Sequence, residues 1–419
     1  MTIFGSDTVD RPPSYPGMVD IPVSMGKAVP GEKGDGAGGY RKSLGLVELV
    51  SLGVGGTIGS GIFVVPAIAA GLLGSLSLLA WVVVAVSATC VMLCLAWTSE
   101  EARGTGAFSA IFGRVYGPRA SLALVLCYLV SSLFGTATIA AGIGQYLAYF
   151  GIPWILPAEI GIILVLLAIN LRGILLSGKT EIVLTLLKVV PLVAVILLLL
   201  PFITWEHFVP SVPFTLPAFA ATMVIVYWPF TGFEISAIPV EETRDPTLIT
   251  RALFLVMAVV ILIYLGLNLA LIGSVGSGPL ASSPAPVAEA ASLVVPLSGP
   301  IVALVGIIAM LSAMNAYIIG TSRVVQNLAE GHGVASLSGL GGRGTPVPAL
   351  LLACLVPIVF LFFSNRFSIL AGISVITTLI PYLGICIAAA LLLRNMKARV
   401  VAALGGATTV LILVLALMI

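Results

Sequence analysis

The sequence predicts an all-α polytopic membrane protein with about eleven transmembrane helices. Its 419 residues are 59% hydrophobic and only 9% charged, and the mean hydropathy is +1.19. A soluble domain usually carries roughly a quarter charged residues, so this composition excludes a water-soluble globule. A spanning helix needs about 20 predominantly apolar residues, and apolar runs of that kind cover most of positions 46 to 419.

The first 44 residues have a different composition from the rest of the chain. Proline, glycine and charged residues are frequent in residues 1–44, which predicts a flexible cytoplasmic tail. A signal peptide would instead have a short basic start and an apolar core. Beyond the tail, apolar runs bounded by glycine, proline and charge predict spans near 46–72, 74–98, 118–150, 158–174, 178–202, 216–240, 247–275, 297–328, 346–363, 366–393 and 397–419.

The positions of the 19 lysines and arginines support this division into spans. With a cytoplasmic N-terminus, all but two of them fall in the tail or in cytoplasmic loops. The exceptions are Arg366, on the outer side, and Lys188, within a span. Membrane proteins retain positive charge on the cytoplasmic side, so the asymmetry predicts a multi-pass protein of the cell membrane with its N-terminus inside.

Signals for enzymatic chemistry are weak. All five cysteines lie in apolar segments, which predicts neither a disulfide framework nor a zinc site. Residues 173–180 match the phosphate-binding pattern G-x-x-x-x-G-K-[ST], but they form a short turn between spans rather than the strand-to-helix loop of a soluble domain. We therefore predict no enzyme activity, no cofactor and no metal, and nucleic acid has no basic patch to bind.

Two of the predicted spans are interrupted. The first contains the glycine-rich stretch 55–61, and the sixth contains Pro229 and Gly232, with Pro239 beyond them. Non-helical backbone at membrane depth is tolerated only where it is buried in protein or lines a cavity. The breaks open two successive groups of five spans, which predicts an inverted-repeat transporter with repeats at about 45–202 and 216–393. Close-packing glycines are the alternative interpretation.

Two ionisable residues within the predicted spans are candidate functional residues. Lys188 lies about ten residues into its span, which is roughly 15 Å deep at 1.5 Å per residue. A lysine at that depth usually faces the protein interior and could bind and release a proton during transport; a snorkelling or structural lysine is the alternative. Glu234, beside the second break, could be a proton carrier, a gate residue or a helix-capping group, or a hydrogen-bonded carboxylate with no such role.

Together the two breaks predict a pocket for a zwitterion. The N–H groups near Ser60 and Gly61, at the start of the outer half-helix, could bind a carboxylate. Unwound carbonyl groups could accept hydrogen bonds from an ammonium group. Trp228 and Tyr317 could wall the pocket by stacking or cation–π contact, although aromatic residues in spans are more often packing residues or interface anchors.

Residues 56–66, with the sequence GTIGSGIFVVP, resemble the first-helix signature of the amino acid-polyamine-organocation (APC) superfamily. Further matches follow in the same order along the chain, over about residues 43–393. They are Asn170, Gly173, Lys179, Thr185 and Lys188 for helices 4 and 5, FTGFE at 230–234 and EETRDP at 241–246 for helix 6, and Thr345-Pro346 and TLIPYL at 378–383 for helices 9 and 10.

This resemblance implies the LeuT-type fold of five plus five inverted helices, with helices 1 and 6 unwound, and an amino acid substrate moved by alternating access. Residues 45–393 would form the ten-helix transporter core, and 394–419 an additional helix. A twelfth span of the family has no counterpart, which is expected to affect oligomerisation more than transport.

The resemblance also implies the site. Ser60 and Gly61 would hold the substrate carboxylate, and the carbonyls of Thr57, Trp228 and Thr231 would receive the amine. Comparison with the bacterial arginine/agmatine antiporters makes Trp228 the outer gate and places Tyr317 where they have a middle-layer tryptophan. The same comparison assigns the inner gate to Tyr128, Glu234 and Tyr382, and the helix 3 side of the pocket to Ser131, Ser132 and Thr136.

Lys188 departs from the antiporters. It resembles the lysine that occupies the place of sodium in proton-coupled or sodium-independent APC amino acid transporters, so bound sodium is not expected there. This resemblance implies contacts from its ammonium group to helix 1 carbonyls near Val54 and to a helix 8 hydroxyl, for which we expect Ser312.

The favoured function is therefore uptake of an amino acid coupled to protons and independent of sodium. An amino acid or amine exchanger is the second interpretation, and a membrane sensor that binds amino acids without moving them is a third. Small neutral or aromatic amino acids are expected, because no acid except Glu234 obviously enters the pocket to bind a cationic side chain. The expected partners are the amino acid, the proton and the lipid bilayer, while homo-oligomerisation is left open.

Overall fold

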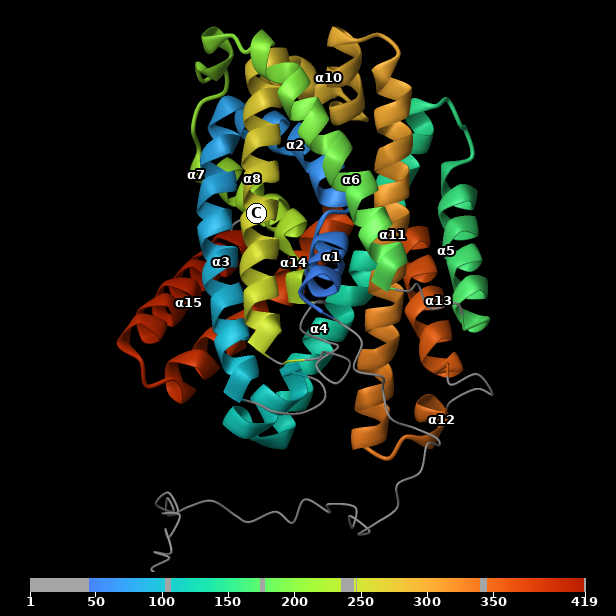
Figure 1. The fold of residues 1–419 in the computed structure, drawn as a ribbon, viewed down its shortest axis with the longest axis vertical. Coiled ribbons are helices and arrows are strands. Elements are labelled where there is room, and N and C mark those ends of the chain that lie inside the picture. Colours follow the sequence, from blue (N-terminus) through green and yellow to red (C-terminus); the bar gives the residue numbers. More distant parts are fainter. Residues whose placement is uncertain are drawn as a thin grey trace, which may run out of the picture. The chain divides into compact units, whose positions relative to one another are not determined.

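The computed structural model describes residues 45–101, 107–173, 178–234, 245, 247–339 and 345–417. These residues form helices joined by turns and short loops (Figure 1). The α-helices are α1 Leu46–Thr57, α2 Ser60–Leu73, α3 Ser77–Glu101, α4 Ala107–Tyr149, α5 Ile155–Leu171, α6 Gly178–Leu199, α7 Leu216–Tyr227, α8 Thr247–Val275, α9 Ser277–Ser282, α10 Pro286–Val294, α11 Ser298–Gly331, α12 Ala335–Ser338, α13 Val347–Phe363, α14 Phe367–Leu392 and α15 Met396–Ala416. The 3₁₀ helices are η1 Gly74–Leu76, η2 Leu200–Phe202, η3 Trp205–Phe208 and η4 Trp228–Phe230.

The described helices include many that are long and apolar enough to cross a membrane. Within the described ranges there are 7 such segments, and three shorter apolar helical segments accompany them at Ile155–Leu171, Leu216–Phe230 and Val347–Phe363. The first segment, Leu46–Ser99, contains both of the first two predicted spans. Large apolar side chains such as Leu262, Val165 and Phe362 are exposed on the outside of the bundle, as expected for helices that contact lipid. The prediction of a multi-pass helical membrane protein is confirmed.

α4 extends beyond the span predicted at 118–150. It begins at Ala107, and the backbone leaves helical geometry at Gly117, where φ is +77°. Pro118 follows, and a proline ring cannot accept helical geometry in the residue before it without strain. The predicted boundary therefore coincides with a kink between two helical segments. The short helices α9, α10 and α12 lie between predicted spans.

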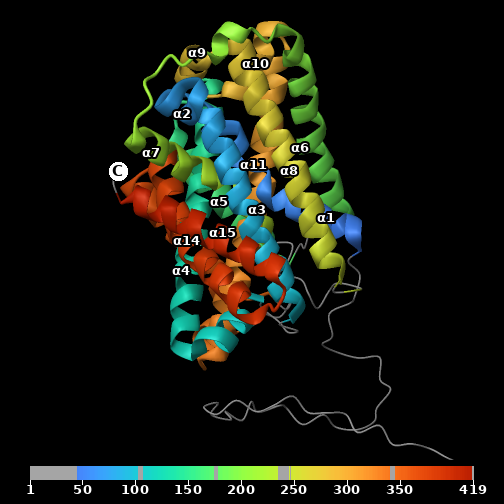
Figure 2. The same cartoon turned by 90° about the vertical axis from the view of Figure 1, so that its left-hand side faces the viewer.

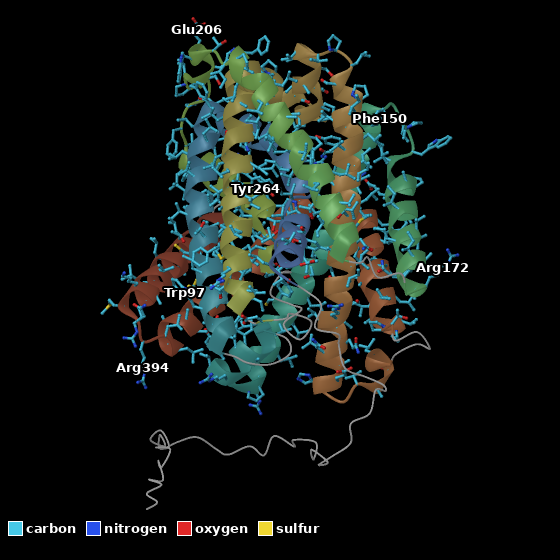
Figure 3. All side chains as sticks on the ribbon, viewed as in Figure 1. Trp97, Phe150, Arg172, Glu206, Tyr264 and Arg394 are labelled. Carbon is cyan, nitrogen blue, oxygen red and sulfur yellow. The ribbon has the colours of Figure 1, made fainter. Side chains whose placement is uncertain are left out.

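The two ends of the described bundle carry different side chains. Figure 3 places Arg172 and Arg394 in the lower half of the view, and Glu206 and Phe150 in the upper half. Trp154, just before α5, and Trp205, at the start of η3, are near Phe150 and Glu206 in the sequence and are largely exposed. Exposed tryptophans next to apolar helices are typical of membrane interfaces.

Contacts between helices that are far apart in the sequence bring the interrupted spans together. α4 packs against α14 and α11, α1 packs against α6 and α8, and α2 packs against α7. Figure 2 shows α9 and α10 at the end of the bundle close to α2, and both of these short helices contact α2.

Some sequence predictions fall outside the described residues. They are the tail 1–44, Pro239, the charged residues Glu241, Glu242 and Arg244, and the side chain of Lys179. The division into inverted repeats at 45–202 and 216–393, and the separate status of 394–419, stay predictions.

α15 packs against α14 and α3 at a glycine. A β-carbon on Gly405 would lie 3.0 Å from both Sγ of Cys386 and Cβ of Cys90. We expect Gly405→Val to destabilise the folded protein by about 1–3 kcal/mol, because its methyl groups have no space there. The measurement is the temperature at which the purified protein loses its monodisperse gel-filtration peak. Gly372→Val is the control, since a β-carbon on Gly372 meets nothing within 4 Å; equal losses in both variants would contradict the packing explanation.

Candidate functional site

The first interrupted span changes direction between α1 and α2. α1 ends at Thr57, Ile58 and Gly59 have non-helical backbone angles, and α2 begins at Ser60. A β-carbon on Gly59 would lie 2.8 Å from Cβ of Ala313, so α11 packs directly on the break. The backbone therefore leaves helical geometry inside the glycine-rich stretch 55–61.

The sixth span is interrupted as well. α7 ends at Tyr227, η4 follows at Trp228–Phe230, and a turn contains Thr231 and Gly232. Pro229 has no N–H group to continue an α-helix. Gly232 has a φ of +99°, and a β-carbon there would lie only 2.7 Å from the carbonyl oxygen of Gly56. Glycine is therefore required at position 232 both by the backbone angle and by the contact with α1.

The two breaks contact each other directly. A β-carbon on Gly61 would lie 2.6 Å from Cα of Pro229, so the start of α2 lies against the backbone of η4. The hydroxyl of Tyr264, on α8, lies 2.9 Å from the carbonyl oxygens of both Thr57 and Pro229. The ring of Tyr264 is fully buried and packs edge-on against Phe230, with ring centroids 5.2 Å apart. The Tyr264 hydroxyl is thus within hydrogen-bond distance of carbonyls from both interrupted spans.

A small cavity lies between the breaks. The centre of a water molecule can occupy a volume of about 10 Å³ in this cavity, which is room for about one water molecule. Trp228 Nε1 donates a hydrogen bond to Ser60 Oγ across the cavity at 3.2 Å, and the rings of Trp228 and Tyr317 lie 5.9 Å apart. Lining residues come from both breaks, α4 and α11: Gly56, Thr57, Gly59, Ser60, Gly61, Ile139, Trp228, Thr231, Ala313 and Tyr317.

Backbone groups around this cavity differ in how many hydrogen bonds they already make. The carbonyl oxygen of Trp228 accepts from the N–H of Thr231 at 3.1 Å and from its hydroxyl at 2.8 Å. The hydroxyl of Thr231 also lies 3.2 Å from that of Tyr317. A carbonyl oxygen has two lone pairs, so Trp228 has none left for an ammonium group in this conformation. The carbonyl of Thr57 accepts from Tyr264 and keeps one lone pair.

The three α4 hydroxyls expected in the pocket make other contacts. Ser131 bonds to Thr378 and lies 3.2 Å from Ser374 Oγ, both on α14. Ser132 donates to the carbonyl of Tyr128, and Thr136 to that of Ser132, within α4 itself. None of the three lines the described cavity, where α4 contributes Ile139 instead.

The residues expected at the inner gate lie together. Tyr382 donates to Glu234 Oε2 at 2.8 Å, and Tyr128 donates to Glu234 Oε1 at 3.3 Å. The N–H of Gly232 also donates to Oε2, at 3.0 Å. The Glu234 carboxyl group is buried and thus connects the second break to α4 and α14.

Lys188 is fully buried and lies against the first break. Its Nζ donates to the carbonyl oxygen of Gly55 at 2.7 Å, next to the position expected for Val54. One turn earlier on α6, Thr185 Oγ1 donates to the carbonyl of Ser51 at 2.9 Å. The expected contact to Ser312 is not made, because Ser312 Oγ is buried without a hydrogen-bond partner among the described residues.

Comparison with known protein families identifies the family of this chain. A profile of the amino acid permease family matches residues 44–419, which is nearly the whole chain. The chain belongs to the amino acid permease family. The APC resemblance in the sequence is therefore confirmed, and this permease is a membrane transporter of amino acids rather than an enzyme.

Relatives of this permease are distant in sequence. The inner membrane transport protein YbaT of Escherichia coli is 28% identical over 305 residues, covering 69% of each chain. The L-methionine/branched-chain amino acid exporter YjeH of the same species is 28% identical over 340 residues, covering 76% of this chain and 78% of the relative. The L-asparagine permease of Streptomyces coelicolor is 25% identical over 407 residues, covering 89% and 81%.

Two residues that the sequence did not single out lie at the candidate site. Tyr264 has one signal in the sequence: it is the only tyrosine in the predicted span 247–275, and a buried tyrosine hydroxyl usually needs a partner. Gly135 has no such signal. A β-carbon there would lie 2.6 Å from Tyr317 and 3.2 Å from Trp228, so this glycine gives both rings their space beside α4.

The contact between the breaks can be tested at Gly61. We expect Gly61→Ala to weaken amino acid binding about tenfold or more, which is about 1.4 kcal/mol, because the new methyl group separates Ser60 from η4. The measurement is equilibrium binding of a mixture of labelled neutral amino acids to the purified protein. Gly71→Ala is the control on the same helix, since its β-carbon would make an ordinary 3.5 Å contact with Ala281. If a folded Gly61→Ala protein binds amino acids as the wild type does, the two breaks do not form the binding site.

Proposed function

We propose that this permease is a secondary active transporter that takes up a neutral amino acid with a proton, without sodium, by alternating access. Lys188 is the observation that carries the proposal. Its buried amine lies 2.7 Å from a carbonyl oxygen at the first break, and the resemblance to sodium-independent APC transporters places this lysine where other transporters bind sodium. A buried lysine in a membrane protein can gain and lose its proton as its surroundings change.

The substrate would bind between the two breaks. Its carboxylate would accept hydrogen bonds from the N–H groups at Ser60 and Gly61, at the positive end of α2. Its ammonium group would donate to the carbonyls of Thr57 and Thr231, with that of Trp228 joining once Thr231 moves. The residues that line the cavity have no formal charge, which favours a neutral side chain on the substrate.

Two groups of aromatic residues would act as gates. The cavity is too small for an amino acid in this conformation, so Trp228 and Tyr317 must move apart to admit one; we assign them to the outer gate and middle layer. The cluster of Tyr128, Glu234 and Tyr382 would form the inner gate, because its hydrogen bonds must break for α4 and α14 to separate below the second break. The charge pattern of the sequence favours a cytoplasmic N-terminus.

Efflux or exchange through the same pocket is the second candidate. It is favoured by the similarity to YjeH, which is an exporter of methionine and branched-chain amino acids. The pocket would be the same, but an imposed inward proton gradient alone would not accumulate the substrate.

Uptake into proteoliposomes separates these candidates. A mixture of labelled amino acids is supplied under an inward proton gradient, an inward sodium gradient, or no gradient with unlabelled amino acids inside. We expect accumulation with the proton gradient only. Uptake that occurs only with internal amino acids would replace the proposal by exchange, and accumulation with sodium would contradict it.

Lys188 provides a second test of the coupling. We expect Lys188→Ala to reduce proton-driven accumulation at least tenfold, because the buried cation at the break is lost. Thr185→Val is the matched variant: it removes the neighbouring hydrogen bond between α6 and α1 but keeps the amine. Lys397→Ala, on the exposed start of α15, controls for the loss of a positive charge. If Thr185→Val and Lys188→Ala reduce accumulation equally, Lys188 acts by holding α1 rather than by carrying charge.

A further inference from the structure

Glu159 is a buried acid that lies outside the site described above. The buried side chains of α5 form one stripe along the helix: Glu159, Ile163, Leu167 and Asn170. At the C-terminal end of this stripe, Asn170 donates a hydrogen bond to Asn315 Oδ1 at 2.8 Å. At the other end Glu159 is only 1% exposed, and its Oε2 has no hydrogen-bond partner among the described residues.

A glycine on α4 provides the space for this carboxyl group. A β-carbon on Gly144 would collide with Oε1 of Glu159 and would lie 3.0 Å from its Cδ. The acid therefore lies directly on the backbone of α4. Glu159 is in the second turn of α5, roughly 6 Å along the axis from the start of the helix, so it is close to the α4–α5 loop that contains Phe150 (Figure 3).

Neither α13 nor the half of α4 near the α4–α5 loop carries a positively charged residue, and the two arginines of α4, Arg114 and Arg119, lie in its other half. α4 and α13 are the main neighbours of α5. The half of α4 near the loop carries Tyr146, which donates to a carbonyl of α2, and Tyr149, whose hydroxyl lies next to α11. The only titratable residue of α13 is Cys354. Ionising a carboxyl group that has a buried oxygen without a hydrogen-bond partner costs several kcal/mol, so this packing favours the neutral acid.

We propose that Glu159 is a proton-binding site whose carboxyl group holds a proton while α5 is packed on Gly144 and releases it to water when the two helices separate. The same α4 carries Gly135 beside Tyr317, and Tyr128 on Glu234. Gate movements that shift α4 therefore also shift the surface that covers Glu159. The inference rests on the proton-coupled function proposed above and adds a second proton-binding group to Lys188.

The protonation state can be measured without transport. Glu159→Gln has nearly the same shape as the protonated acid but never ionises. We expect both proteins to have similar melting temperatures at pH 5, and the wild type to fall below the variant by a few degrees as pH rises to 9. The reason is that the folded protein must keep a proton which the unfolded chain releases, so its stability is lost as pH rises.

Glu206→Gln is the matched control, because Glu206 is an exposed glutamate in η3. Its melting temperature should follow that of the wild type at every pH. Parallel pH profiles for the wild type and Glu159→Gln would overturn the proposal. A Glu159→Gln protein that does not fold would also overturn it, because the neutral isostere reproduces the proposed buried form.

Transport then tests the part that Glu159 takes in coupling. In proteoliposomes, Glu159→Gln should retain exchange of labelled against internal amino acids and should lose proton-driven accumulation at least tenfold. Wild-type accumulation by the variant would overturn a role in coupling. Absence of proton-driven uptake in the wild type would reject the proposed function instead, while the melting profiles would still decide whether Glu159 binds a proton.

Discussion

Contact between the two broken helices is the constraint on which the rest of the site depends. Unwound backbone inside a membrane protein must find its hydrogen bonds within the protein, because lipid offers none. Here the two breaks share one partner, since the Tyr264 hydroxyl lies within hydrogen-bond distance of carbonyls from both. Within the second break, Glu234 accepts the N–H of Gly232. Gly61 and Gly232 allow the approach, since a β-carbon at either would meet backbone atoms of the other span. The cavity is what remains between two backbones held this close.

The two halves of the first span are attached to different neighbours. α1 is tied to α6, where Thr185 and Lys188 donate to the carbonyls of Ser51 and Gly55, four residues apart on α1. α2 instead packs against α7 and α9. The non-helical residues Ile58 and Gly59 lie between these attachments. Such an arrangement is suited to a hinge, because a few residues at the ends of elements absorb the change in backbone angles when one half moves.

Composition predicted the helices and breaks well because both leave strong local signals. Apolar runs ended by charge mark spans, and clustered glycine and proline mark departures from helical geometry. The residues at Glu234 were grouped by a family resemblance, and the structure brings Tyr128 and Tyr382 into contact with its carboxyl group. Local sequence patterns do not show how a helix is rotated relative to its neighbours. Ser131 therefore contacts α14 rather than the cavity, and Ser312 does not contact Lys188. Tyr264 was missed because a single hydroxyl in an apolar run looks like packing.

The length of two adjacent helices has a consequence for the surrounding lipid. α5 and α13 have 17 residues each and pack side by side. At 1.5 Å per residue each is roughly 26 Å long, shorter than a hydrocarbon core of about 30 Å. A short wall of this kind thins the adjacent bilayer or draws its flanking residues inward, at a cost that grows with each ångström of mismatch. The acyl-chain length of the lipids sets the thickness of the bilayer. It therefore affects the position of α5, and with it the packing of Glu159 against α4. If Glu159 binds a proton as proposed, membrane thickness would affect the same packing as pH.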